Sequence, residues 1–150
     1  LGSAFKVNEY FSVTPSYFFI KYEAQGHFEE EHRYMLDAAF SWKTKRLKLS
    51  HRSRFEYRDL PALDRWRYRA RLKAGLPVKV HNRSLTPYIS EEIFYDERKG
   101  EFNQNRFSLG SVIKINKTVS VDVYYLLRSD KKGGDWSERN ALGTSLNLSF

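Results

Sequence analysis

The chain has 150 residues, enough for one domain with a core, and its 26 Lys and Arg against 18 Asp and Glu give a formal net charge of +8. Aromatic residues make up 16% of it and cysteine is absent, which excludes a disordered segment, a disulfide scaffold and a cysteine-based metal site. The sequence has no apolar run of about 18 residues, which excludes a spanning helix but not a β-barrel, whose hydrophobicity is hidden in alternation.

Alternation with a period of two runs along nearly the whole chain and predicts nine β-strands. They are a short strand ending at Val7, then residues 11–19, 33–43, 47–58, 64–74, 86–96, 104–115, 119–128 and 141–150. The clearest is 64–74, where arginines alternate with apolar side chains; an α-helix would spread those arginines around its axis. In 86–96, Glu91 falls on the apolar face, which indicates a bulge.

The connections between these strands alternate in length. Tight turns at Asn8, residues 44–45 and residues 116–117 interleave with longer polar loops, and only 77–85 departs from this rule. The expected long loops are residues 25–32, 59–64, 97–103 and 129–140. This order predicts an all-β fold, an up-and-down antiparallel transmembrane β-barrel that occupies residues 1–150 as a single domain.

Nine is an odd count, whereas bacterial single-chain membrane barrels use an even number of strands. We therefore expect one or more further N-terminal strands and a barrel of ten to twelve in all. The first residues, Leu1 to Ala4, contain no initiator Met and no signal segment. A leader has been removed, or the chain is part of something longer.

The distribution of aromatic residues and charges favours a barrel whose apolar face points outward to lipid. Aromatic side chains gather near strand ends on the apolar face, as interfacial girdles require; they are Trp42, Phe55, Tyr57, Trp66, Tyr95 and Phe150. The polar face mixes many arginines with carboxylates that can neutralise them. The residues expected to line the lumen are Arg33, Asp37, Arg52, Arg54, Glu56, Arg58, Arg65, Arg67, Arg69, Arg71, Glu92, Arg106, Asp122 and Arg128.

The C-terminal segment resembles the signal by which bacterial outer-membrane barrels are recognised by their assembly machinery. Residues 142–150 have an apolar side chain at nearly every second position and end in Phe. The residues expected to carry the signal are Gly143, Leu146, Leu148 and Phe150. This segment, together with the upstream strands, predicts the bacterial outer membrane as the location.

Five segments also make the chain similar to a family of bacterial outer-membrane β-barrel proteins that is catalogued only as a domain of unknown function. They are residues 7–13 (VNEYFSV), 51–58 (HRSRFEYR), 67–72 (RYRARL), 87–94 (PYISEEIF) and 105–110 (NRFSLG). The resemblance covers nearly all of the chain and implies an outer-membrane barrel with further strands ahead of the turn at Asn8. It implies no activity, cofactor or substrate.

Two roles are open for the arginine-rich lumen: an ion-pair network that only holds the barrel together, and a narrow pore that favours anions. We expect that the protein is not an enzyme and binds no cofactor, because the sequence offers no set of residues arranged for catalysis. His51 lies on the apolar face and His81 in the odd turn. His27 and His32 flank three glutamates, but a solvated acidic loop explains them better than a metal site, so no metal is expected.

The expected partners are outer-membrane lipid, lipopolysaccharide, the barrel-assembly machinery and other outer-membrane proteins. Nucleic acid is not expected, because Trp66 and Tyr68 face away from the neighbouring arginines and the two sets cannot share one binding surface. Two alternatives remain: a soluble lipocalin-like carrier of a hydrophobic ligand, whose early Gly-x-Trp signature is missing, and a basic nucleic-acid-binding β protein.

Overall fold

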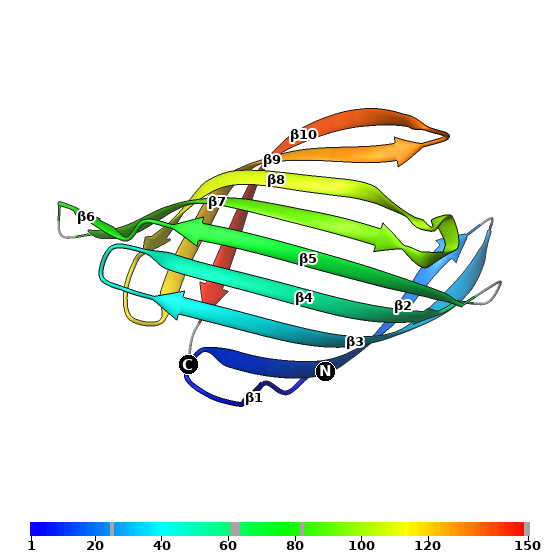
Figure 1. The fold of residues 1–150 in the computed structure, drawn as a ribbon, viewed down its shortest axis with the longest axis horizontal. Coiled ribbons are helices and arrows are strands. Elements are labelled where there is room, and N and C mark those ends of the chain that lie inside the picture. Colours follow the sequence, from blue (N-terminus) through cyan, green and yellow to red (C-terminus); the bar gives the residue numbers. More distant parts are fainter. Residues whose placement is uncertain (25, 61–63, 82, 149–150) are drawn as a thin grey trace.

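The computed structural model of the chain describes all residues except 25, 61–63, 82 and 149–150 (Figure 1). Ten strands and one short 3-10 helix make up the described part: β1 (Phe5–Lys6), β2 (Phe11–Ala24), β3 (His27–Lys43), β4 (Lys48–Asp59), β5 (Arg65–Gly75), β6 (Val78–Val80), β7 (Arg83–Asp96), η1 (Glu97–Lys99), β8 (Glu101–Lys114), β9 (Val119–Lys132) and β10 (Asp135–Leu148). No helix in this part of the chain is long and apolar enough to cross a membrane.

The strands form one antiparallel sheet in up-and-down order, which confirms the predicted fold class. The order is β1-β2-β3-β4-β5-β7-β8-β9-β10, so each strand of this path pairs with the strands before and after it. One strand, β6, lies off this path. It pairs only with the beginning of β7, and the sequence does not predict it. Figure 1 shows the sheet as a strongly curved layer, and among the described strands β10 does not pair with β1, so the sheet is not closed.

The three predicted tight turns are present, and polar side chains close each of them. Asn8 Oδ1 accepts from the backbone N–H groups of Tyr10 and Phe11 at 2.8 and 2.9 Å. Thr44 and Asn116 accept in the same way from the backbone of the residues that follow them. Such side chains mimic a backbone turn and so allow the next strand to begin at once.

The predicted long loops at 25–32 and 129–140 are wrong, because strand covers residues 27–32, 129–132 and 135–140. The β2–β3 ladder continues to Ala24 opposite His27, and the β9–β10 ladder continues to Lys132 opposite Asp135. Glycines make these sharp turns, and Gly133 and Gly134 both have positive φ, at 61° and 101°. Both hairpins are therefore longer than the alternating part of their sequence.

The other predicted connections also differ in detail. Residues 97–103 contain η1 and the start of β8, and the odd segment 77–85 is a small hairpin of β6 with β7. Part of the 59–64 loop lies outside the described residues. The register shifts between Phe94 and Tyr95 rather than at Glu91, and this irregularity keeps the faces of β7 and β8 matched on both sides of it.

Candidate functional site: the arginine-rich inner face

One face of the sheet is concave, and bonds between distant strands identify it. Arg52 on β4 donates to Glu92 on β7 at 2.8 Å, although β5 lies between them. Arg67 on β5 donates to Gln104 on β8 at 2.7 Å across β7. Only the concave side of a curved sheet brings such side chains within reach of one another. We call this side the inner face and the opposite side the outer face.

Two buried glutamates lie at the centre of the inner face and gather the arginines around them. Glu56 on β4 is 1% exposed and accepts from Arg69 Nη1 at 2.8 Å. Glu92 on β7 accepts from Arg52 at 2.8 Å and from Arg69 at 3.2 Å. Because Arg69 reaches both carboxylates, it joins three strands through one guanidinium. The planar guanidinium suits this role, since its donors point in several fixed directions.

A bidentate pair extends the network toward β3. Arg54 donates through Nε and Nη2 to the two oxygens of Asp37, at 2.5 and 2.6 Å. Arg54 also lies 3.9 Å from Glu56. The pair therefore connects directly to the central glutamates, and opposite charges on this face are neutralised locally.

Two further carboxylates anchor the hairpin extensions, and sequence reasoning missed both. Glu31 on β3 accepts from Arg58 in bidentate fashion, at 2.5 and 2.9 Å, and from Arg33 at 2.9 Å. Asp130 on β9 accepts from Arg128 and Arg139. Both carboxylates fell in segments predicted to be loops, so their position on the inner face was not recognised. The signal in the sequence is that Glu31 lies two residues before Arg33, so that a longer strand places both side chains on the same face.

Phe94 also lies on the inner face, although it is not among the residues predicted to line the lumen. Its ring is 0% exposed and lies on the inner face of β7, between guanidinium groups. The guanidinium carbons of Arg67, Arg69 and Arg106 lie 4.6, 4.7 and 4.7 Å from the ring centroid. A desolvated aromatic ring attracts cations through its negative face, so Phe94 separates and holds three like charges.

The pairing register places all fourteen predicted lumen residues on the inner face. Twelve of them make an ion pair or a side-chain hydrogen bond there, namely Arg33, Asp37, Arg52, Arg54, Glu56, Arg58, Arg67, Arg69, Glu92, Arg106, Asp122 and Arg128. Arg65 and Arg71 have no such contact with the described residues, although they lie in register opposite Arg58 and Arg52. All four predicted carboxylates thus have a partner, while the guanidinium groups of Arg65 and Arg71 have no acceptor among the described residues.

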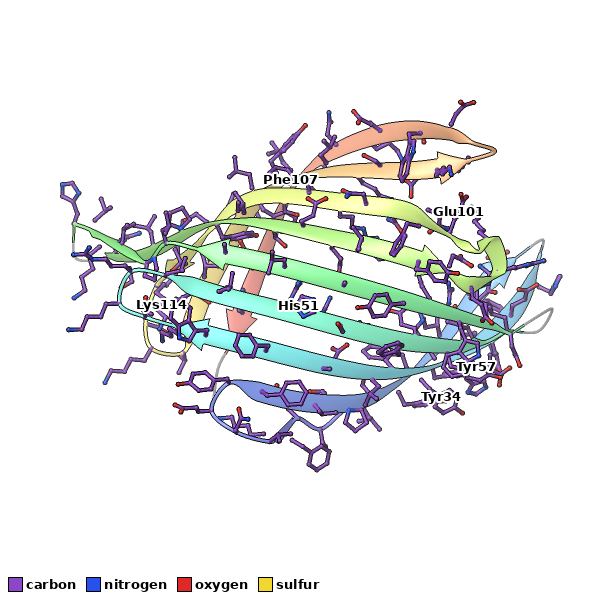
Figure 2. The ribbon with its side chains drawn as sticks, viewed as in Figure 1. Tyr34, His51, Tyr57, Glu101, Phe107 and Lys114 are labelled. Carbon is purple, nitrogen blue, oxygen red and sulfur yellow. The ribbon has the colours of Figure 1, made fainter. Side chains whose placement is uncertain are left out.

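A row of aromatic side chains crosses the outer face near one end of the sheet. Tyr17, Tyr34, Tyr57 and Trp66 lie opposite one another on β2 to β5, with centroids 5.3, 6.2 and 4.9 Å apart. Figure 2 shows Tyr34 and Tyr57 at this end and Lys114 near the other.

Trp42, at the opposite end of β3 from this row, marks the other edge of the apolar band on the outer face. Trp42 lies eight residues beyond Tyr34 on β3. Eight residues span roughly 27 Å along a strand, or about 20 Å after a tilt of about 40°. The apolar side chains between the two levels are exposed, among them Leu36 and Phe40. Their band is close in height to the apolar band of about 25 Å in membrane barrels.

Two titratable residues lie in the middle of this outer face. His51 and Glu91 lie on either side of Leu72 in the pairing register, as their alternation predicts. Asn105 Nδ2 donates to Glu91 Oε1, so a neighbouring strand satisfies the carboxylate. Along that row, Phe40 lies beyond His51, and Phe107 and Leu127 lie beyond Glu91 before the row ends at Asn140 on β10.

The histidine-containing acidic segment is strand rather than loop. His27 lies 3.5 Å from Glu29, and Glu29 accepts from the Tyr22 hydroxyl at 2.9 Å. His32 Nδ1 lies 2.7 Å from the Tyr17 hydroxyl. Within the described residues, no group of three or more His, Cys, Asp or Glu side chains is arranged to hold a metal ion.

The predicted assembly segment is divided between the two faces of β10. Leu146 and Leu148 are exposed on the outer face, beside Val121 and Val119. Gly143 faces inward opposite Tyr124, and a Cβ there would lie 2.5 Å from the Tyr124 ring. Phe150 lies outside the described residues. The glycine therefore has a packing role that is separate from any signal.

Comparisons with known proteins support the fold. A family described as Protein of unknown function (DUF2490) matches residues 1–139. A solved structure titled "Bacterial polysaccharide outer membrane secretin" is similar, with a TM-score of 0.72 and 13% sequence identity. The similarity covers 99% of this chain and 55% of that one, so this chain spans about half the length of the other. No curated protein matches the sequence.

Proposed function

The chain belongs to the family described as Protein of unknown function (DUF2490), and on that premise we propose that it is an integral β-barrel protein of the bacterial outer membrane. Its apolar outer face contacts lipid, and its arginine-rich inner face lines an aqueous interior. The role of this interior is to hold the barrel by ion pairs and to favour anions.

The observation that carries this proposal is the distribution of burial between the two faces. Phe40 and Leu72 on the outer face are exposed, whereas Glu56, Glu92 and their arginine partners are largely buried. A protein in water buries its apolar face and solvates its charges. The reverse arrangement is what a hydrocarbon solvent requires, because only apolar side chains can face lipid at low cost.

The same observation argues against the two soluble alternatives. A lipocalin-like carrier needs apolar side chains around an internal ligand, and here the inner face is charged. A nucleic-acid-binding sheet needs accessible arginines beside stacking aromatic rings. Arg67 and Arg69 instead lie against Phe94, whose ring is fully buried.

A membrane location also requires that the sheet be closed. Unpaired backbone groups at a sheet edge cost several kcal/mol each in hydrocarbon, so β1 and β10 must find partners there. The nine-stranded path from β1 to β10 therefore needs pairing at both edges to close, within the ten to twelve strands expected from the sequence.

Cell fractionation combined with electrophoresis tests the membrane assignment. We expect the protein in the outer-membrane fraction after a carbonate wash, and we expect its mobility on a gel to differ before and after boiling. Folded membrane barrels resist detergent until heated, because all their backbone hydrogen bonds are internal. Recovery without detergent together with identical mobility in the two samples would refute the assignment.

A second role, a passage that favours anions, follows from the charge balance of the interior. The residues predicted to line it are ten arginines and four carboxylates, and once Glu31, Asp130 and Arg139 are added the arginines still outnumber the carboxylates, eleven to six. Rings of arginine or lysine select anions in pores. We expect the protein in a planar bilayer to conduct chloride better than potassium, and Arg71→Glu to reduce that preference. Equal permeability of the two ions would leave only the structural role of the ion pairs.

A further inference from the structure

A cavity of about 270 Å³ opens on the inner face between β5 and the strands β7 to β10. Cationic and hydroxyl-bearing side chains dominate its lining; the main ones are Arg71, Lys73, Tyr88, Ser90, Ser108 and Ser145. The lining differs from the tightly paired centre around Glu56, because short hydroxyl side chains replace arginines on one wall. The ion-pair network therefore does not fill the whole interior.

Two glycines keep this cavity open. A Cβ on Gly143 would lie 2.5 to 2.7 Å from the ring and hydroxyl of Tyr124, so the end of this side chain packs directly against the bare backbone of β10. A Cβ on Gly110 would lie 2.8 Å from the Tyr88 hydroxyl. Real side chains at either position would push a tyrosine inward. The glycines thus place two phenol groups along the wall and leave the space beside them free.

The charge available inside the cavity is positive. Glu92 already accepts from Arg52 and Arg69, and Asp122 already accepts from the Tyr88 hydroxyl at 3.0 and 3.1 Å.

The cations of the lining are less engaged than these carboxylates. Arg71 makes no ion pair with the described residues. Arg106 makes one long pair, with 4.0 Å between its Nη1 and Glu92 Oε2, and its buried Nε has no acceptor among the described residues. Lys73 Nζ is 3.9 Å from Asp122 and lies over the Tyr88 ring, 3.3 Å from its centroid. The carboxylates are thus occupied, while the Arg71 guanidinium has no acceptor among the described residues.

We propose that this cavity binds one sugar unit that carries an oxyanion, either a carboxylate or a phosphate. A guanidinium recognises both anions through paired N–H donors, and Arg71 on β5 and Arg106 on β8 supply them on the two sides of β7. The serine and tyrosine hydroxyls supply donors and acceptors for the hydroxyls of a sugar ring. The volume of about 270 Å³ is at the small end for a ligand pocket, which suits a single sugar ring.

This inference deepens the proposed function and rests on it, because the inner face must be open to water for a polar ligand to enter. Calorimetric titration of the folded protein in detergent micelles tests it. The probes are glucuronic acid, glucose 6-phosphate, glucose and inorganic phosphate. We expect one or both acidic sugars to bind at least tenfold more tightly than glucose or inorganic phosphate. The stronger of the two identifies carboxylate or phosphate as the preferred anion.

Variants locate the site. Arg71→Gln is expected to raise the Kd of the acidic sugar at least tenfold. Arg65→Gln is the matched control, since it removes the same charge from the same face of β5, roughly 20 Å away along the strand. It is expected to leave the Kd unchanged. Gly143→Ala keeps the charge but displaces the Tyr124 ring, and it is also expected to weaken binding at least tenfold.

Gel mobility before and after boiling shows that each variant is folded. Equal affinity for glucose and the acidic sugars would overturn the site, as would equal losses in Arg71→Gln and Arg65→Gln. Loss of heat-dependent mobility in the unaltered protein would overturn the membrane assignment instead, so the two failures are distinguishable.

Discussion

At the scale of single residues, each buried carboxylate of the inner face serves more than one arginine. Glu56 lies near Arg54 and Arg69, and Glu92 accepts from Arg52 and Arg69. Removing one partner of a buried pair leaves an uncompensated charge, which costs about 3–5 kcal/mol. The carboxylates are fewer than the arginines, so each of them matters more to stability than any one arginine.

Glu56→Gln therefore tests the network directly. We expect a loss of about 3 kcal/mol in the free energy of unfolding, measured by urea titration in lipid vesicles, because Arg69 keeps its charge and loses its main partner. Glu30→Gln is the matched control. Its pair with Lys21 is exposed on both sides, and the expected loss is below about 0.5 kcal/mol. Similar losses in the two variants would contradict the role assigned to Glu56.

Phe94→Leu tests the aromatic contribution to the same cluster. Leucine fills much of the volume but offers no negative face to Arg67, Arg69 and Arg106, so we expect a loss of about 2 kcal/mol in the same measurement. Phe28→Leu is the control, since that exposed ring meets one cation, Lys21, at 5.5 Å. A loss below about 0.5 kcal/mol for Phe94→Leu would show that the ring only fills space.

The identity of the inward arginines was predictable from sequence, but Phe94 was not. Arginines at every second position of β5 define the polar face without ambiguity. Phe94 shares the parity of Glu92 and Ser90, and this parity is the available signal. An aromatic side chain is ordinarily assigned to an apolar face, however, and its contact with guanidinium groups from β5 and β8 depends on strand pairing that no local pattern contains.

At the scale of elements, the hairpin extensions show where alternation stops being informative. Alternation arises when one face of a strand meets an apolar environment and the other does not. Most of β10 before Leu142 is exposed, and its sequence does not alternate. The ladder with β9 continues there because backbone hydrogen bonds need no apolar face. For this reason the strand ends within 25–32 and 129–140 could not be located from the sequence.

Asp130→Asn tests what holds the β9–β10 extension together. Asp130 accepts from Arg128 and Arg139, which flank it on the two strands. Both arginines are more than one-third exposed, so screening limits the expected loss to about 1 kcal/mol. We expect amide exchange to accelerate about fivefold between residues 128 and 139 and to stay unchanged in β4 and β5.

Asp135→Asn, at the tip of the same hairpin, is the control for that exchange measurement. It is expected to leave the exchange rates as they are. Acceleration throughout the sheet in Asp130→Asn would show that this carboxylate supports the whole fold and not the extension alone.

At the scale of the whole molecule, the two faces were predictable and the closure of the sheet was not. Alternation assigns every residue of a strand to one of two faces, so the charged and apolar sides follow from sequence once a strand is recognised. Which side is concave depends on the sign of sheet curvature and on long-range ion pairs such as Arg52 with Glu92. Edge pairing depends on strands that face β1 and β10, and neither edge carries a pattern that specifies its partner.

The proposed function depends on whether the outer face of the whole sheet contacts lipid or water. Leu109→Arg tests which of the two it contacts. Leu109 is 55% exposed on β8, with Ile89 and Tyr125 as its neighbours across the strands. An arginine at such a position costs about 2–4 kcal/mol when the face meets hydrocarbon and stays within about 0.5 kcal/mol when it meets water. Val80→Arg introduces the same charge at a residue of similar exposure, 49%, on the short strand β6 beyond the apolar band. We expect unfolding in lipid vesicles to separate the two variants by at least 2 kcal/mol. Equal stabilities would mean that water covers both sites, and the lipid-facing orientation would then be wrong.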